Sequence, residues 1–235
     1  GNKPQLVIIH ETANDSSTLD NEISYMVRNQ ENAFVHSFVS DNRLKTIANK
    51  SKMAWGAGPK GNPYGIQIEQ TRVKSKEAFA KQIANLANWT AMQMIQYNLG
   101  APKLVSTTSK AVDGNLASHE NISYKWGGTD HVDPVWYWND RGSRFFGQGY
   151  NMTQFRDLVS YYYNQLGIPK INSTSVEGNP ATGEFKVRVK TSGVVTRVSV
   201  PIWSHANGQD DLLWYPATKV KDDEYSTTSA GAHHN

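Results

Sequence analysis

The chain has 235 residues, which is enough for one large domain or for one domain and a small module. It contains no cysteine, so disulfides, thiolate metal ligands and a cysteine nucleophile are all excluded. The formal net charge of +3 is too small to indicate nucleic-acid binding, and no apolar run reaches the roughly 18 residues of a transmembrane helix.

Short apolar runs between polar loops predict the strands of the first part of the chain. Residues 5–10 are apolar and β-branched, which predicts a buried strand. Residues 33–48 predict a hairpin that turns at an Asp-Asn pair. Residues 65–70 alternate as a strand, with Ile66 and Ile68 on one face and Glu69 on the other. Glu69 is therefore expected either in a cleft or at a strand edge in water.

Three longer stretches have the apolar spacing of amphipathic helices. The first covers about residues 17–30, where Ser17 opens an S-x-x-D helix start. The second covers residues 75–99 and is stopped by a glycine, and the third covers residues 151–167. Because strands alternate with long helices, residues 1–167 are predicted to form one α/β domain.

The composition changes after this domain. Residues 168–182 are rich in Pro, Gly, Ser, Thr and Asn, which predicts a linker. Residues 183–235 contain alternating runs at 184–191, 194–203 and 212–220, which predict a small all-β module. No closing strand is visible before the chain ends at "GAHHN", so the module is expected to be incomplete.

Two histidines stand at positions where functional groups gather. His10 ends the first apolar strand, where an α/β sheet presents side chains to its crevice. His119 follows a polar, glycine-containing loop. A structural role, as a hydrogen-bonding residue or at the start of a helix, would explain either histidine equally well.

The stretch "GGTDHVDP", residues 127–134, is an irregular loop that holds one imidazole between two carboxylates. In an extended segment, residues two apart project to the same side, with Cα atoms about 6.5–7 Å apart. His131 and Asp133 can therefore flank one small site. Asp130 faces away, and we expect it to fix the loop through hydrogen bonds.

These residues match the usual inventory of a catalytic zinc, which is two histidines, one carboxylate and an open fourth position. A nearby glutamate and a further histidine would move protons and stabilise an oxyanion. The chain offers this set as His10, His119 and Asp133 for ligands, with Glu69 and His131 beside them. Spacing alone does not decide which histidines are ligands, and His36 is an equal candidate on the pattern.

Several segments, in this order, resemble zinc-dependent N-acetylmuramoyl-L-alanine amidases of the branch found in Gram-positive autolysins and phage lysins. They are "LVIIHETAND", "EISYMVRNQENAFVHSFVSDNRL", "WGAGPKGNPYGIQIE", "SHENISYKWGGTDHVDP" and "YNMTQFRDLVSYYYNQLG". The resemblance covers about residues 4–167. It implies a central mixed β-sheet flanked by helices, as in the related peptidoglycan recognition proteins.

The resemblance also implies roles for individual residues. Zinc would bind His10, His119 and Asp133, with Glu69 as the catalytic glutamate and His131 as the second catalytic group, whereas His36 matches a position that is not a ligand. The implied substrate is peptidoglycan, cut at the amide between N-acetylmuramic acid and L-alanine. Substrate-binding residues are expected at Glu11, Trp55 and Thr129, although Trp55 could equally belong to the core.

Two other functions use the same fold or the same chemistry. The first is a non-catalytic module that binds peptidoglycan, but such relatives typically lack a metal ligand, and here the full set is present. The second is a zinc endopeptidase that cuts within the stem peptide, which only the reaction products distinguish. The sequence therefore favours an amidase.

The tail "VSVPIWSHANGQDDLLWYPATK" resembles the Bsp-like repeat of streptococcal surface and wall-lytic proteins. This resemblance implies attachment to the cell wall, with other wall polymers as ligands. The chain begins with only a short apolar run, so no signal peptide is expected. A secreted, wall-associated protein that has lost its leader, or a phage lysin, fits the sequence, and a monomer is expected because no heptad seam is present.

Overall fold

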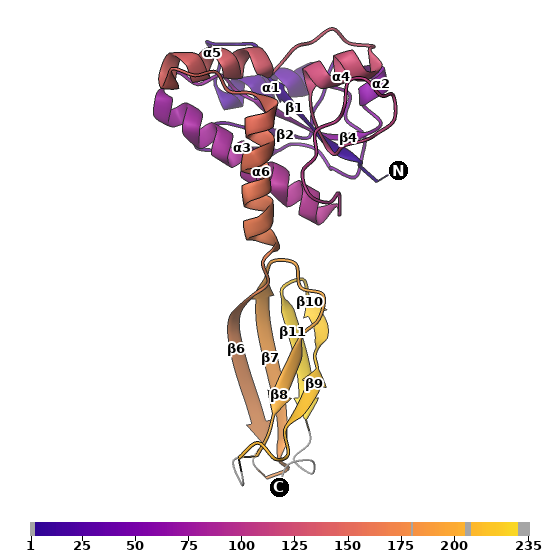
Figure 1. Ribbon diagram of the computed structural model, residues 1–235, viewed down its shortest axis with the longest axis vertical. Coiled ribbons are helices and arrows are strands. Elements are labelled where there is room, and N and C mark those ends of the chain that lie inside the picture. Colours follow the sequence, from indigo (N-terminus) through magenta and orange to yellow (C-terminus); the bar gives the residue numbers. More distant parts are fainter. Residues whose placement is uncertain (1–2, 180, 205–207, 230–235) are drawn as a thin grey trace. The chain divides into compact units, whose positions relative to one another are not determined.

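The structure is a computed structural model that describes residues 3–179, 181–204 and 208–229 (Figure 1). The chain divides into two compact units, Gly1–Asn164 and Gln165–Asn235, which are described separately. Within the described residues, no helix is both long enough and apolar enough to cross a membrane.

The first unit is built on a five-stranded sheet with the order β3-β2-β4-β1-β5. Strand β1 pairs in parallel with β4 and β5, β2 pairs in parallel with β4, and β3 is antiparallel to β2. This confirms the predicted mixed sheet and the predicted hairpin. The strands are β1 Leu6–Glu11, β2 Ser37–Val39, β3 Leu44–Thr46, β4 Gly65–Gln70 and β5 Leu116–Ser118.

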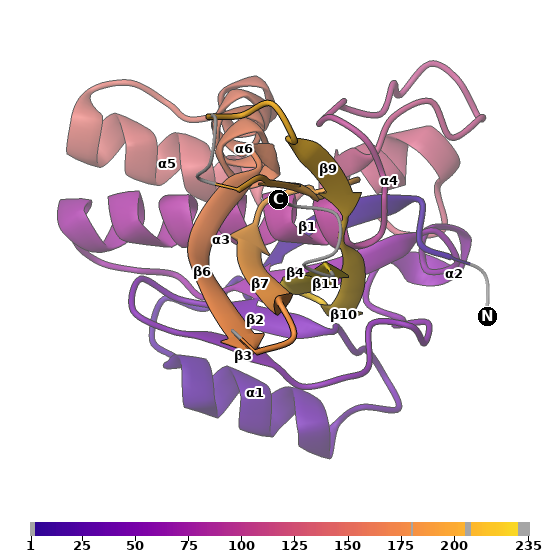
Figure 2. The same ribbon diagram turned by 90° about the horizontal axis from the view of Figure 1, so that it is seen from below.

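Helices cover both faces of this sheet, and Figure 2 shows α1 and α3 on opposite sides of it. The helices that begin in this unit are α1 Leu19–Arg28, α2 Gly58–Gly61, α3 Lys76–Gln96, α4 His119–Trp126, α5 Val135–Phe146 and α6 Met152–Gly167. Ser75 caps α3 as predicted, by accepting a hydrogen bond from the backbone amide of Ala78. For α1 the predicted start is wrong by one residue, because the side chain of Thr18 is the one that accepts from the Asn21 amide.

Strands β1 and β4 place alternate side chains on one shared face of the sheet. Leu6 and Ile8 of β1 pack in one apolar cluster with Ala57, Ala117 and Ile122. Gly65 and Gln67 of β4 lie opposite Leu6 and Ile8, so they are on the same face. The next pair on this face is His10 and Glu69, at the ends of the two strands. The alternation that the sequence predicts for β4 is therefore confirmed, and it determines the face on which polar side chains emerge.

The second unit consists of a four-stranded sheet with the order β10-β11-β7-β6 and a two-stranded sheet, β8-β9. All strand pairs in it are antiparallel. The strands are β6 Lys170–Asn179, β7 Glu184–Ser192, β8 Ser199–Ile202, β9 Leu213–Pro216, β10 Thr218–Lys221 and β11 Glu224–Ser229. This confirms the small all-β module.

Some elements of this unit differ from the prediction. The linker predicted over residues 168–182 is wrong for β6, since pairing with β7 along one edge makes this polar segment a strand without an apolar run. Strand β11 was missed because "EYSTTS" is almost wholly polar, although four of its six residues are buried. The single strand predicted over 212–220 is two strands, which separate after Pro216. The predicted end of the module at "GAHHN" lies outside the described residues.

Candidate active site

The register of three parallel strands brings the predicted site together. His10 of β1 is directly opposite Glu69 of β4. On the other side of β1, Ile9 is opposite Ser118 of β5, and His119 is the next residue along the chain. All three side chains therefore emerge at the carboxyl ends of neighbouring parallel strands, where α/β sheets bind ligands.

Two histidines and one aspartate converge at this edge. The Nδ1 atoms of His10 and His119 are 3.0 Å apart. From Asp133, Oδ1 lies 3.2 Å from Nδ1 of His119 and Oδ2 lies 3.7 Å from Nδ1 of His10. Among the described residues, these three form a cluster whose donor atoms all lie within 4.8 Å of one another.

This donor set fits a zinc ion. Tetrahedral zinc with bonds of about 2.0–2.1 Å to nitrogen or oxygen separates its ligand atoms by about 3.3–3.4 Å. The observed separations of 3.0, 3.2 and 3.7 Å lie around that value. The close approach of two imidazole nitrogens is also explained, because a shared cation lets both act as electron-pair donors.

Neighbouring groups orient the three candidate ligands. The hydroxyl of Thr129 lies 3.0 Å from Nε2 of His119, on the far side of the ring. The backbone amide of Glu11 donates to Oδ2 of Asp133 at 3.1 Å. Ser118 and Asn121 form a capping box that fixes the start of α4, where His119 is the first residue. Such second contacts set the rotamer and the tautomer of metal-binding side chains.

Lys125 holds α4 from its other end. Its side chain is fully buried, and its ammonium group donates to the carbonyls of Ser106 and Ser109, at 2.6 Å each, and to Oδ1 of Asp113 at 2.9 Å. A buried lysine is tolerated only when it is paired in this way. Sequence reasoning missed this role, since the partners of Lys125 lie in a loop that has no regular pattern.

The pKa values of two candidate ligands, His10 and Asp133, suit metal binding. Burial, and next the charge on His119, lower the pKa of His10 to about 3, so its imidazole is neutral at physiological pH. Burial alone would raise the pKa of Asp133, but hydrogen bonds from His119 and His131 hold it well below its ordinary value. Neutral imidazole and ionised carboxylate are the forms that bind zinc.

Glu69 lies beside these ligands in a different environment. Its Oε2 atom is buried and has no hydrogen-bond partner among the described residues. Burial, and next the charges of Asp133 and Glu11, raise its pKa well above the ordinary value. A raised pKa brings a carboxyl group closer to the range in which general acids and bases work.

His131 is the most exposed member of the group, with 63% of its side chain accessible. Its ring is stacked on that of His119 at a centroid distance of 4.5 Å, and its Nδ1 lies 3.5 Å from Oδ1 of Asp133. The interaction with Asp133 is the main reason why the pKa of His131 is raised. The imidazole therefore faces solvent at the mouth of the site and is readily protonated.

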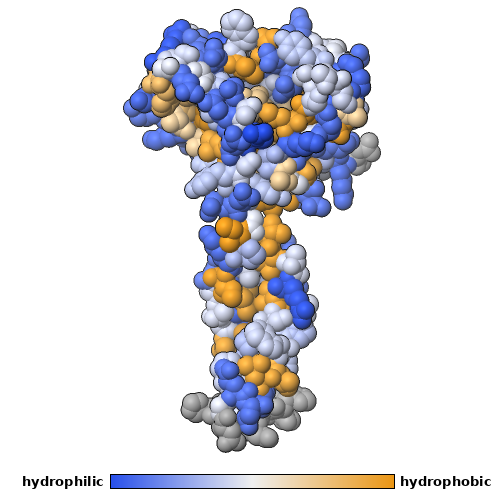
Figure 3. Space-filling model, in the orientation of Figure 1, coloured by the Kyte–Doolittle hydropathy of each residue, from blue (hydrophilic) through white to orange (hydrophobic). Residues whose placement is uncertain are grey.

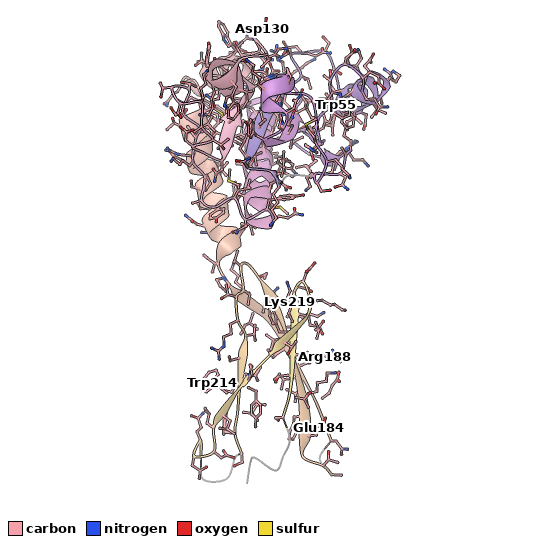
Figure 4. All side chains as sticks on the ribbon, turned by 90° about the vertical axis from the view of Figure 1, so that its right-hand side faces the viewer. Trp55, Asp130, Glu184, Arg188, Trp214 and Lys219 are labelled. Carbon is pink, nitrogen blue, oxygen red and sulfur yellow. The ribbon has the colours of Figure 1, made fainter. Side chains whose placement is uncertain are left out.

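Two other predictions have different outcomes. His36 is buried, accepts from the Gln67 amide at Nδ1 and contacts the Lys52 carbonyl through Nε2, so it is a structural histidine outside the cluster. The loop-fixing role predicted for Asp130 is wrong. Its side chain is exposed and makes no hydrogen bond within the part of the chain that the structure describes (Figure 4).

The structure places the three predicted substrate-binding residues differently. The carboxylate of Glu11 is 3% exposed, binds Arg72 through two 2.8 Å hydrogen bonds and accepts from the Ala13 amide, so it is not free to contact substrate. Thr129 contacts a candidate ligand, as described above. Trp55 is 39% exposed and stacks on Phe34, so it remains a predicted binding residue.

Comparisons with known proteins agree with this geometry. Residues 1–136 match the family model described as N-acetylmuramoyl-L-alanine amidase, and residues 174–235 match the model described as GBS Bsp-like repeat. The Staphylococcus aureus hydrolase AmiA, solved in complex with its ligand, is 34% identical with a TM-score of 0.59, over 68% of this chain and 73% of that chain.

Curated relatives show the same similarity within much longer proteins. Protein Ami of Listeria monocytogenes is 37% identical over 81% of this chain, and the bifunctional autolysin of Staphylococcus epidermidis is 37% identical over 68% of it. The matches span only 19% and 11% of those two proteins. The matched model, which covers more than half of the chain, and the shared fold show that the chain belongs to the N-acetylmuramoyl-L-alanine amidase family.

Proposed function

We propose that this chain is a zinc-dependent hydrolase of bacterial peptidoglycan, which cuts the amide between the lactyl group of N-acetylmuramic acid and L-alanine. The observation that carries this proposal is the convergence of His10, His119 and Asp133 beside a carboxyl group with a raised pKa. Membership of the amidase family supplies the substrate class.

His10, His119 and Asp133 would hold a zinc ion, which when bound would supply a Lewis acid for the scissile carbonyl and for a water molecule. Glu69 accepts the proton of this water and delivers it to the leaving amine, so that one group serves as base and then as acid. Its raised pKa suits this double role, because a more basic carboxylate takes up a proton more readily before passing it on.

His131 stabilises the negative charge that develops on the carbonyl oxygen. Its exposed ring can approach a bound substrate, and Asp133 favours the protonated, donating form. Thr129 and the backbone of Glu11 keep His119 and Asp133 in place during the reaction. The roles of Glu69 and His131 are thus complementary, since one moves protons and the other supplies a positive charge.

The test is mass spectrometry of purified peptidoglycan digested by the full chain, with and without a zinc chelator. Free stem peptides that begin with L-alanine, lost on chelation and regained with zinc, are expected. Peptides that begin at a later residue would make the chain an endopeptidase, and intact peptidoglycan in a pull-down with the chain would make it a binding module.

A pair of variants assigns the chemistry to Glu69. Glu69→Gln is expected to lower the rate of hydrolysis by about 10²–10⁴-fold, the typical contribution of general acid–base catalysis, while zinc stays bound. Glu77→Gln, at an exposed position in the first turn of α3, is the matched control and is expected to keep wild-type activity.

For the second unit we propose attachment to wall polymers, which would place the enzyme at the cell wall. Exposed aromatic side chains support this proposal, because they stack on sugar rings. Trp214 is 63% exposed and Trp203 is 42% exposed. Figure 4 labels Trp214 in this unit. Loss of wall binding, with unchanged hydrolysis of soluble muramyl peptides, is expected for Trp214→Ala.

A further inference from the structure

The strand edges of the second unit differ in how they are protected. An open edge presents unpaired backbone groups, and proteins usually protect it by shortness, bulges, prolines or lysines. Strand β10 has four residues, an irregular register and two lysines. Strands β8 and β9 carry Pro201 and Pro216. Each of these edges is thus poorly suited to pairing with another strand.

Strand β6 is less protected, because its lysine and its bulge both lie at its first residues. It is ten residues long, contains no proline, pairs only with β7 among the described strands and is exposed along its whole length. It also carries apolar side chains, since Ile171 is 70% and Val176 is 63% exposed. Figure 3 shows apolar side chains at the surface of this unit. This edge therefore offers both backbone groups and apolar surface to a further strand.

A β-bulge determines how the side chains of β6 are distributed. Asn172 is an extra residue, because Ile171 is opposite Thr191 while Ser173 is opposite Lys190. Ile171 and Val176 consequently share the face of the sheet that carries the buried residues Thr191 and Val187. Without the extra residue, side chains five positions apart would lie on opposite faces.

The charged ends of β6 lie together on the other face. Lys170 is opposite Ser192, and Glu177 is opposite Lys186, which is exposed. Along the strand the order is therefore cation, apolar residue, polar centre, apolar residue and anion. When two such strands pair antiparallel, apolar residues lie opposite apolar residues and the cation of each strand lies opposite the anion of the other.

We propose that β6 pairs antiparallel with β6 of a second copy of this chain, about a two-fold axis at Thr174. With one bulge in each strand, this register places Val176 opposite Ile171 of the second copy and Glu177 opposite Lys170 of the second copy. Opposed residues then lie on the same face of the joined sheet, with apolar side chains opposite apolar ones and each anion opposite a cation. A two-fold arrangement closes on itself, so the product is a dimer in which two four-stranded sheets join.

The mass of the full chain tests the dimer directly. Sedimentation velocity is expected to show a shift from 26.2 kDa to twice that mass as the protein concentration rises. Val176→Lys is expected to raise the dimer dissociation constant about tenfold or more, because the two-fold axis makes one substitution remove two apolar contacts. Val220→Lys, on the opposite edge and 51% exposed, is the matched control and should dimerise as the wild type does.

Charge exchange tests the register. Lys170→Glu and Glu177→Lys should each weaken the dimer, since each places like charges opposite one another. A mixture of the two variants should form a heterodimer, because every opposed pair then has opposite charges. Glu177 also contacts Arg188 of its own chain, at 3.5 Å. If Glu177 acted only through that contact, mixing the two variants would not restore the dimer.

A single cysteine tests the axis, since the chain has none of its own. Thr174→Cys should form a disulfide dimer in air at low protein concentration, because residue 174 is opposite itself. Thr218→Cys on β10 should not. The proposal is wrong if the wild type stays at 26.2 kDa at all concentrations, if both lysine variants weaken association equally, or if species larger than a dimer accumulate. Amidase activity is expected to be the same in all of these variants.

Discussion

The central strands of the first unit and the edge strands of the second unit differ in burial and in the direction of pairing. In the first unit, β1 is buried along its whole length and β4 along all but one residue, and both are parallel to their neighbours. In the second unit, β6 and β10 are exposed throughout, and every pair is antiparallel. The buried sheet directs polar side chains to the ends of its strands, whereas the exposed sheet offers its edge.

This difference explains where chemistry is located. Buried parallel strands exclude water along their length, so the charged groups at their ends interact strongly with one another. The altered pKa values of His10, Glu69 and Asp133 are the result. In the second unit, charges such as Arg188 and Glu177 lie on a solvated face, where interactions are weak. Substitutions in the two units should therefore differ greatly in their effects.

The largest effect is expected for Asp133→Ala. The substitution removes one of three ligand groups and leaves His10 and His119 without a carboxylate partner. Zinc content, measured by atomic emission after gel filtration, should fall to background, and peptidoglycan hydrolysis should fall with it. Asp130→Ala is the control from the same loop, since its side chain is exposed and makes no contact with the ligands. Normal zinc content in Asp133→Ala would reassign the third ligand.

A smaller loss is expected for His131→Gln, together with a changed pH profile. Glu69 must be deprotonated to act as base, so activity should fall as the pH drops through its raised pKa. His131 must be protonated to donate as a cation, so activity should fall as the pH rises through its raised pKa. His131→Gln should lower kcat/KM by about 10²–10³-fold, as loss of an oxyanion donor does, and remove the alkaline limb. An alkaline limb that persists would assign it to another group.

The effect of Lys125→Met is expected on stability rather than on chemistry. Methionine fills a similar volume but leaves the carbonyls of Ser106 and Ser109 and the carboxylate of Asp113 without their donor. Hydrogen bonds to a charged group contribute about 1.5–3 kcal/mol each, but removing the ammonium group also removes its cost of burial, so a net loss of about 2–4 kcal/mol in the free energy of unfolding is expected. Urea denaturation of the chain measures it, with Lys81→Met, at an exposed position of α3, as the control.

The sequence predicted the parts of the molecule that follow short-range rules. The apolar run before His10 and the alternation of residues 65–70 predicted β1, β4 and the face on which Glu69 lies. What these patterns do not contain is pairing over a distance. The carboxylate of Glu11 is bound by Arg72, which is 61 residues further along the chain. The local pattern around Glu11 could not show that this carboxylate is occupied and therefore not free to contact substrate. Strand β6 was missed for the same reason, because its extended conformation depends on pairing with β7.

The next effect in size is expected for Thr129→Val, which keeps the volume of the side chain and removes the hydroxyl beside Nε2 of His119. Loss of such a contact behind a metal ligand typically lowers metal affinity by about 10–100-fold. Competition with a zinc chelator measures this change. Thr108→Val, in an exposed loop, is the control. Unchanged affinity, with lower activity on peptidoglycan, would return Thr129 to the substrate-binding role that the sequence indicated.

The smallest effect is expected in the second unit. Arg188 of β7 lies between Glu224, at 3.2 Å, and Glu177, at 3.5 Å, and 36% of its side chain is exposed. Exposed ion pairs contribute about 0–1 kcal/mol, so Arg188→Ala should change the free energy of unfolding by less than about 1 kcal/mol. High salt should remove most of that difference, because salt screens exposed charges. A loss as large as that of Lys125→Met would show that the second sheet also depends on buried charge, and the contrast between the two units would then fail.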